Sequence, residues 1–169
     1  MTRSEGSKTE YKVYLAGPIR GCSTEESTDW RERIKMRYSE DFTFIDPTDW
    51  YYKAIEDFDP DTASHELIVR DEQKIMDADA VLANMWRESI GTSIGICIAS
   101  QEGIPVVLID SNHLDSIILS YYADAICYTV EEGIEKIKAF ETQKNIFQQL
   151  RKSTRVKQSR LVGRNYPNQ

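Results

Sequence analysis

The sequence predicts an α/β domain whose mostly parallel sheet of five strands has helices on both faces. Short apolar runs alternate along the chain with longer segments of helical spacing, and turns with glycine, proline, aspartate or serine separate them. At 169 residues, the chain is long enough for one domain with a substantial core. Strands that alternate with helices form a parallel sheet, and ligands bind such a sheet at the carboxyl ends of its strands.

The expected strands are runs of aliphatic and aromatic residues bounded by turn-forming residues. The loop 17–21, with its two glycines and a proline, ends the first strand, and the Asp46-Pro47 turn ends the second. The third, AVLAN, leads into a small polar turn at residues 89–93. The strands are expected at residues 11–16, 42–45, 80–84, 105–110 and 125–129.

The segments between these runs are expected to be helical. Ser23, Ser27 and Thr28 are candidate N-caps of the first helix, in which large side chains recur at i, i+4 and i+8 up to residue 38. Residues 48–64 are aromatic and acidic without a clean period, which favours a loop or a short helix. Further helices are expected at residues 68–77, 94–100, 116–122 and 130–150.

Composition narrows the class of protein. No apolar run approaches the roughly 20 residues of a membrane span, and the polar N-terminus lacks the apolar centre of a signal peptide. The three cysteines are odd in number and unclustered, which favours neither a disulfide framework nor a zinc site. We therefore expect a cytoplasmic protein with reduced thiols and without a metal or cofactor. Cys97 is expected to be a buried thiol, and His65 and His113 surface residues.

Charge is distributed unevenly. Residues 142–169 hold seven basic side chains and no acidic one, whereas the other 141 residues hold 14 basic and 28 acidic side chains. We expect residues 1–10 to be disordered, residues 11–141 to form the domain, and residues 142–169 to form a basic extension. An acidic body argues against broad nucleic-acid binding by the domain itself. The extension would contact nucleic acid, an acidic partner or a neighbouring subunit, or would be a solvated, partly helical segment.

Several motifs occur in a characteristic order: VYLAGPIRG, IDP, IVRDEQKIMDADAVLANMWRESIGTS and GIPVVLI. Over residues 11–109 the chain resembles the nucleoside 2-deoxyribosyltransferase-like superfamily, which implies a flavodoxin-like (Rossmann-like) fold and a homodimer or higher oligomer. The IRG sequence and Ser89 are most similar to 2′-deoxynucleoside 5′-monophosphate N-glycosidases. Relatives that act on free nucleosides tend to have an aspartate where Ser89 stands, which contacts the sugar 5′-hydroxyl.

The resemblance implies a role for each matching residue. Tyr14 would lie near the nucleophile or the sugar, and Asp71 would approach the base or sugar and manage a proton on the leaving base. Arg20, with the N-terminus of the helix after Ser89, would hold a phosphate, for which a guanidinium and backbone N–H groups are suited. Taken singly, these residues also fit plainer roles: tight-turn glycines, a surface arginine and an exposed helical acid. The expected site comprises Tyr14, Asp71 and Gly95 for catalysis and Gly17, Ile19, Arg20, Gly21, Asp46, Ser89, Gly91 and Thr92 for substrate binding.

Gly95 departs from the family pattern. The family places a nucleophilic glutamate in a GTxxE motif, and the chain has glycine at that position, which is also unfavourable within a helix by about 1 kcal/mol. Three interpretations remain open: a protein that binds nucleotides without cleaving them, an enzyme that uses another carboxylate, or an engineered inactive form. The other carboxylates are Glu88, Asp71, Glu66 and Asp46. We therefore expect an N-glycosidase or transferase, or else a catalytically silent sensor, sponge or partner subunit. A weaker hypothesis makes the domain a scaffold for its basic extension.

Overall fold

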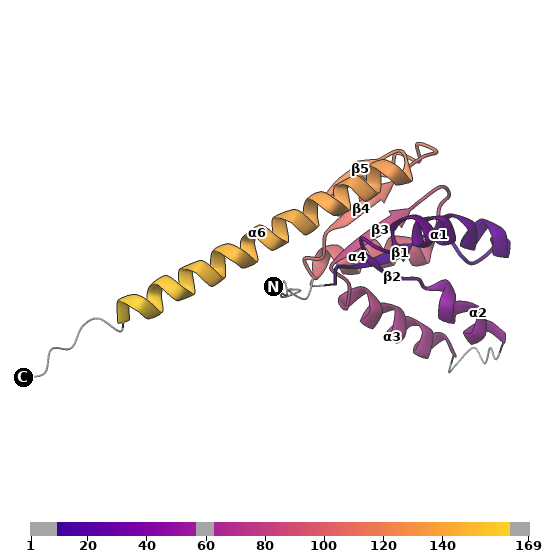
Figure 1. Cartoon of the computed structure of the whole chain (residues 1–169). Coiled ribbons are helices and arrows are strands. Elements are labelled where there is room, and N and C mark those ends of the chain that lie inside the picture. Colours follow the sequence, from indigo (N-terminus) through magenta and orange to yellow (C-terminus); the bar gives the residue numbers. More distant parts are fainter. Residues whose placement is uncertain (1–9, 57–62, 163–169) are drawn as a thin grey trace, which may run out of the picture. The chain divides into compact units, whose positions relative to one another are not determined.

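The computed structural model describes residues 10–56 and 63–162 (Figure 1). The chain divides into two compact units, residues 1–137 and 138–169, and each is described by itself. The expected disorder of residues 1–10 lies, apart from Glu10, outside the described residues. No helix among the described residues is both long enough and apolar enough to cross a bilayer.

The first unit is built on one sheet of five parallel strands in the order β2-β1-β3-β4-β5. The predicted α/β class and strand number are therefore confirmed. In the register, Tyr14 of β1 lies beside Ile45 of β2 and Val81 of β3. All the strands end at one edge, called here the carboxyl edge. Their bounds are β1 Lys12–Ala16, β2 Thr43–Ile45, β3 Ala80–Asn84, β4 Val106–Ile109 and β5 Ala125–Cys127.

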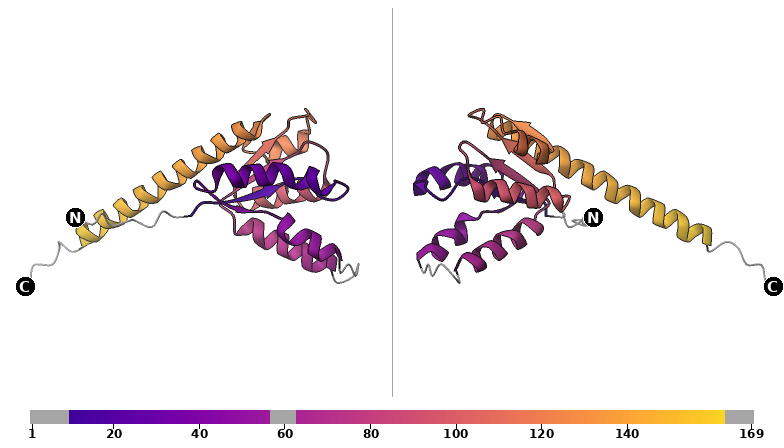
Figure 2. Two further views of the ribbon diagram at one scale, coloured as in Figure 1. Left: turned by 45° about the vertical axis from the view of Figure 1, so that its right-hand side comes forward. Right: turned by 180° about the vertical axis from the view of Figure 1, so that it is seen from behind.

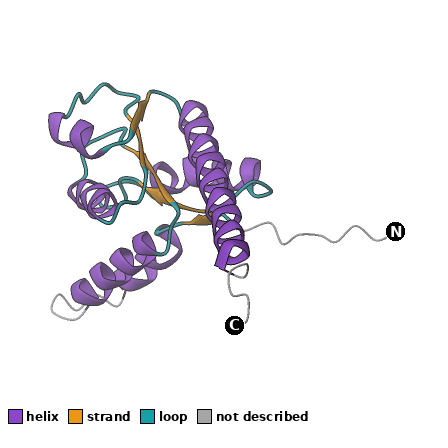
Figure 3. Ribbon diagram, turned by 90° about the vertical axis from the view of Figure 1, so that its left-hand side faces the viewer, coloured by secondary structure: helices purple, strands orange, loops and turns teal. Residues whose placement is uncertain are grey.

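Helices lie on both sides of the sheet (Figure 3). One face packs on α3, α4 and α5 through a core that includes Tyr14, Ile75 and Ile96. The other face carries Leu15 and Leu82 and is covered by α1 and the first turns of α6, where Gly133 lies against Leu82. The helices are α1 Thr24–Tyr38, α2 Thr48–Glu56, α3 Ala63–Met76, α4 Ile90–Gln101, α5 Ile117–Tyr122 and α6 Val130–Val162.

The short helix that was one of the two expectations for residues 48–64 is present as α2, which lies beside α3 (Figure 2). Two segments differ from the sequence prediction. The expected turn at residues 89–93 is largely helical, because Ser89 caps α4 and the helix begins at Ile90. Helix α6 continues beyond residue 150, because no glycine or proline occurs between Gly133 and Gly163. The expected start of the basic extension, residue 142, therefore falls inside this helix.

The cysteine prediction is wrong for Cys97, which is partly exposed. Residues Ile96 and Ala99 of α4 are fully buried, whereas Cys97 lies on the flank of the helix beside α5. There it interacts with the hydroxyl of Tyr122, and this hydrogen bond raises the pKa of the tyrosine. His65 and His113 are exposed, as expected.

Candidate active site at the carboxyl edge

Tyr14, one of the expected catalytic residues, is buried, with 4% of its surface exposed. It stands in the middle of β1, on the face covered by α3 and α4. Burial raises the pKa of its hydroxyl far above the ordinary value, and the charge of Asp71 raises it further. Among the described residues, no hydrogen-bond partner reaches this hydroxyl. Tyr14 therefore stays protonated and keeps its O–H for a ligand.

Asp71 is half-buried on α3 and is held by a partner from α2. Its Oδ1 accepts a hydrogen bond of 2.7 Å from the indole nitrogen of Trp50. Burial raises the pKa of this carboxyl, although the Trp50 hydrogen bond and the charge of Arg70 act in the opposite direction. An aspartate with a raised pKa holds its proton at higher pH, as a group that protonates a leaving base must. The sequence interpretation missed Trp50, since it treated this stretch as a loop or short helix without assigning roles.

The N-terminus of α4 is open to a ligand. Ser89 is its N-cap, and the serine Oγ accepts hydrogen bonds from the Thr92 backbone at 3.4 Å and from the Thr92 hydroxyl at 3.0 Å. Gly91, in the first turn, is exposed, and a Cβ built on it meets no atom within 4 Å. The backbone N–H groups of a first helical turn have no partner within the helix. An anion can therefore approach the main chain at Gly91 closely.

Helices α3 and α4 place Asp71 and Gly91 at similar distances from the carboxyl edge of the sheet. The two helices meet where a Cβ on Gly95 would lie 3.3 Å from Cδ1 of Ile75. Both begin at the carboxyl edge and run back across the same face of the sheet, because each precedes a parallel strand. Asp71 and Gly91 each lie four residues before this contact, about one turn or 5.4 Å nearer the carboxyl edge. The carboxyl group and the open helix terminus thus face one region.

The close contact between α3 and α4 explains the glycine at position 95. Gly95 is buried, and the Ile75 side chain occupies the space that a side chain at this position would enter. A glutamate would have to displace the end of that isoleucine. The helix therefore tolerates a residue of low helix propensity because it permits this contact.

The loop between β1 and α1 is a tight turn, in which the Cys22 N–H donates to the Ile19 carbonyl at 3.1 Å. Gly21 has a φ of 75°, which favours glycine, and its carbonyl accepts a hydrogen bond of 3.0 Å from Arg87. Arg20 is exposed in this loop, and its charge lowers the pKa of Tyr51 on α2 against the larger effect of burial. The loop thus carries an exposed arginine, Arg20. The hydrogen bond from Arg87, which the sequence analysis did not single out, connects this loop to the loop after β3.

Asp46 and Gly17 make contacts within the chain rather than facing an open space. Asp46 is 1% exposed; its Oδ1 accepts from the backbone and hydroxyl of Thr48 at 2.9 and 2.7 Å, and its Oδ2 pairs with Lys35 at 2.8 Å. A Cβ on Gly17 would lie 2.8 Å from Cζ2 of Trp30, so the glycine permits a close packing contact. Their expected roles in substrate binding remain predictions.

Arg31 is a buried cation that the sequence interpretation missed. It is wholly buried and donates hydrogen bonds to the carbonyls of Leu15 at 3.2 Å, Gly17 at 3.0 Å and Ser27. Its Nε lies 3.5 Å from Oδ1 of Asp46. Burial lowers its pKa to about 10, and the charge of Asp46 opposes this shift. The guanidinium therefore fixes the end of β1, from which the loop with Arg20 begins.

Among the described residues, no three His, Cys, Asp or Glu side chains gather as a metal site would require.

Comparisons with known proteins identify the fold. No family model matches the chain, and no curated protein does. Among solved structures, a 2-deoxyribosyltransferase from Bacillus psychrosaccharolyticus matches with a TM-score of 0.56 and 17% identity, covering 68% of this chain and 84% of that one. A conserved protein from Enterococcus faecalis matches with a TM-score of 0.56 and 18% identity, covering 77% and 98%. A CMP N-glycosidase from Clostridium botulinum has a TM-score of 0.49 and 18% identity over 76% and 98%.

The first of these matches shows that the chain shares the fold of a 2-deoxyribosyltransferase. The expected flavodoxin-like α/β architecture is thereby confirmed. A fold alone does not determine the reaction, which depends on the residues of the site.

Proposed function

We propose that the chain binds a (deoxy)nucleoside 5′-monophosphate at the carboxyl edge and cleaves or transfers its N-glycosidic bond. The observation that supports this proposal most directly is the convergence of Asp71 and the open N-terminus of α4 on one region beside Tyr14. The phosphate lies at the backbone N–H groups near Gly91, with Arg20 as the countercharge. The nucleoside extends toward Asp71 and Tyr14.

In this reaction, Asp71 is the carboxyl group that handles the proton. The bond between the sugar C1′ and the base nitrogen breaks, and the protonated Asp71 supplies a proton to the departing base. Water, or a second base in a transfer, then bonds to C1′ and releases a proton to the Asp71 carboxylate. The raised pKa of Asp71 suits this cycle, because a general acid works best when its pKa approaches the operating pH.

A second candidate function is binding without cleavage, and the contact of Gly95 with Ile75 favours it. The position at which the family carries its nucleophile holds no side chain, and the space beside it is filled by an isoleucine. A covalent glycosyl intermediate requires a nucleophilic group at that place. On this alternative, the chain is a sensor, sponge or partner subunit that recognises the nucleotide intact.

One titration separates the two candidates. Trp50 donates to Asp71, so its indole N–H signal in a ¹⁵N-labelled sample reports on this site. Nucleoside 5′-monophosphates should shift the signal, and their nucleosides should bind more weakly. Chromatography of each mixture then shows whether free base is released. Release by the natural chain supports cleavage through Asp71, and binding with intact ligand supports the silent alternative.

Variants sharpen the experiment. Asp71→Asn should bind the monophosphate and release no base, whereas the matched control Asp77→Asn, on an exposed residue just after α3, should behave as the natural chain. Gly91→Ala should fold normally, because its methyl group meets no atom, yet bind the phosphate less well. Gly95→Glu combined with Ile75→Val makes room for the carboxylate and should create or raise base release. Absence of binding by every monophosphate would refute the proposal.

A further inference from the structure

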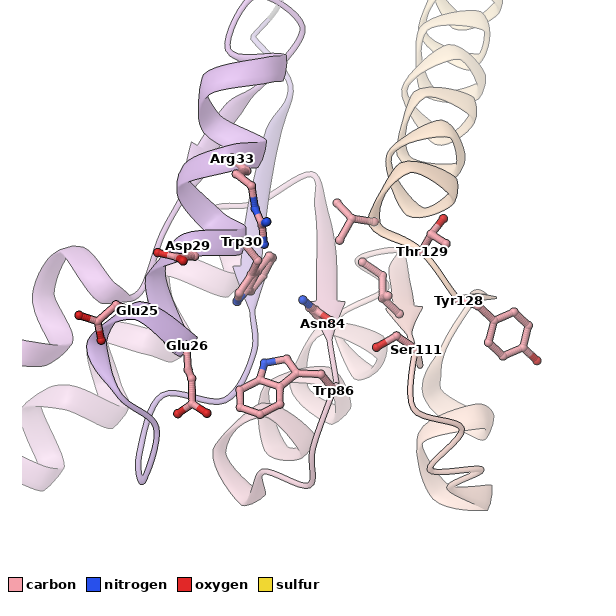
Figure 4. Close-up of a pocket in the computed structure, with 12 residues that line it drawn as sticks. Glu25, Glu26, Asp29, Trp30, Arg33, Asn84, Trp86, Ser111, Tyr128 and Thr129 are labelled. Carbon is pink, nitrogen blue, oxygen red and sulfur yellow. The ribbon is translucent and has the colours of Figure 1, made fainter.

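A cleft lies at the carboxyl edge on the opposite face of the sheet from Tyr14. It has a volume of about 550 Å³ and is lined by α1, the ends of β3 and β4, and the segment that leads into α6 (Figure 4). This volume falls within the range of pockets that hold small molecules. None of the residues expected from the sequence to bind substrate lines it.

The cleft is lined by two indole nitrogens that are buried without a partner and by a buried asparagine. Trp30 is 6% exposed and Asn84 is 7% exposed, and both line the cleft. The indole nitrogens of Trp30 and Trp86 are buried without a hydrogen-bond acceptor. Among the described residues, nothing accepts from or donates to the side-chain amide of Asn84. Buried donors without a partner are uncommon in folded proteins, since each loses its hydrogen bonds to water without a replacement.

The fold holds these groups in place. Trp30 packs against Gly17, where a Cβ would lie 2.8 Å from its ring, and the Arg31 guanidinium stacks 4.4 Å from its centroid. Asn84 is the last residue of β3 and pairs in the sheet with Ile109 of β4. Figure 4 shows the two indole rings and the Asn84 side chain gathered at the centre of the cleft. Trp30 on α1 and Asn84 at the end of β3 are thus held by regular elements, and Trp86 follows two residues after this strand.

The chemistry of the walls defines the ligand. Two indole rings offer flat faces for stacking, and their N–H groups require acceptors on the ligand. The amide of Asn84 both donates and accepts, which matches a ring nitrogen beside an exocyclic amino group. Three exposed acids on α1, Glu25, Glu26 and Asp29, line the same cleft against one cation, Arg33. This excess of negative charge disfavours a phosphate and favours an uncharged or cationic ligand.

We propose that this cleft binds an uncharged, amino-substituted nitrogen heteroaromatic ring, with Asn84 reading its amino edge and Trp30 and Trp86 supplying the indole donors. The free bases adenine and cytosine belong to this class. The site is separate from the one proposed for the nucleoside monophosphate.

Indole N–H signals distinguish the two sites within one sample. The chain has three tryptophans, of which Trp30 and Trp86 line the cleft and Trp50 contacts Asp71. The signals are assigned with the variants Trp30→Phe, Trp50→Phe and Trp86→Phe. Adenine or cytosine should shift the Trp30 and Trp86 signals, and should still do so in the Asp71→Asn variant. Hypoxanthine and uracil, which lack the amino group, should bind at least tenfold more weakly, as should adenosine 5′-monophosphate.

Two variants test the recognition itself. Asn84→Leu, of similar size, should weaken adenine binding at least tenfold, whereas Asn145→Leu, on an exposed position of α6, should not. Asp29 is exposed on α1, so Asp29→Asn should fold normally. It should reduce the difference in affinity between adenine and adenosine 5′-monophosphate. Failure of both bases to shift Trp30 and Trp86 at millimolar concentration would overturn the proposal. Equal binding of hypoxanthine or of the monophosphate at these signals would overturn it too.

Discussion

At the scale of the residue, the pair of Arg31 and Asp46 illustrates how the end of β1 is fixed. Both side chains are completely buried, and the arginine also satisfies three backbone carbonyls. A buried charge that loses its partner destabilises a protein more than the intact pair stabilises it. The loop that carries Arg20 therefore starts from a strand end that is fixed from the interior.

Arg31→Ala should lower the free energy of unfolding by about 3–5 kcal/mol, because it leaves Asp46 buried with a single cation and removes the side-chain donor to three backbone carbonyls. Urea denaturation measures the change. The control is Arg37→Ala on the same helix, where the arginine is 66% exposed and lies 3.5 Å from Glu131. A surface pair of this kind contributes at most about 1 kcal/mol, so equal losses for the two variants would contradict the argument.

The raised pKa of Asp71 makes a prediction about pH. The folded state binds this proton more tightly than the unfolded state, whose value is near 3.8, so the group loses stabilising free energy as pH rises through its folded pKa. Asp71→Asn mimics the protonated form and can still accept from Trp50. It should therefore raise the urea midpoint at pH 7 and do so less at pH 4. An increase in the urea midpoint that does not depend on pH, or that Asp77→Asn also produces, would contradict the raised pKa of Asp71.

At the scale of the element, the strands could be predicted from sequence more fully than the helices. The runs of β1, β3 and β4 are apolar and end at residues that form turns, so local sequence determines their bounds to within a residue or two. Helix α2 was predicted only as one of two alternatives, a loop or a short helix. Its start depends on Asp46, whose own position depends on Arg31 and Lys35. Such tertiary contacts leave no periodic pattern in the sequence.

The site shows the same division. Ser89 and Gly91 were singled out from a local pattern, a small polar turn between an apolar strand and a helix, although the helix starts earlier than expected and includes Gly91. The partner of Asp71 was not, because Trp50 lies 21 residues away and on another helix. Arg31 left only a weak signal, a charged residue beside Trp30 and near Ile34 on the apolar face of α1.

Ser89 has two roles that a substitution can separate. As an N-cap it stabilises α4, and Ser89→Ala should lower the free energy of unfolding by about 1 kcal/mol. Ser89→Asp keeps the cap, since aspartate serves equally well there, but places a negative charge at the proposed phosphate position. Its affinity for a nucleoside monophosphate should fall at least about tenfold, because like charges a few ångströms apart repel by more than the roughly 1.4 kcal/mol required.

Calorimetric titration with a monophosphate and with the matching nucleoside measures both affinities for Ser89→Asp. The affinity for the nucleoside should fall little, so the preference for the monophosphate over the nucleoside should decrease or reverse. Ser116→Ala, which removes the N-cap of α5, is the control for helix stability alone. Equal losses of nucleoside and nucleotide binding in Ser89→Asp would mean that the phosphate does not lie at this helix terminus.

At the scale of the whole molecule, charge divides the sequence into an acidic body and a basic segment. Residues 142–169 contain seven basic and no acidic side chains, and the remaining 141 residues have a net charge of −14. In the second unit, the described residues from 142 to 149 are exposed on α6, and they include Ile146 and Phe147 at 50% and 66% exposure. The acidic first unit would repel a polyanion, so attraction to one has to come from the basic segment.

We expect the full chain to bind duplex DNA or heparin at low salt through this segment. Its affinity should fall steeply as salt rises, with a logarithmic slope of about −0.9 for each phosphate neutralised on the duplex. A chain that ends at Glu141 should lose this binding and keep its nucleotide site, because Ile134 and Ile137, which α6 buries against the first unit's core, are retained. Fluorescence anisotropy of a labelled duplex at several salt concentrations measures the slope. Binding that survives the truncation would place the contact on the acidic unit. Failure of the full chain to bind duplex and heparin at low salt would instead favour an acidic protein or a neighbouring subunit as the partner of the basic segment.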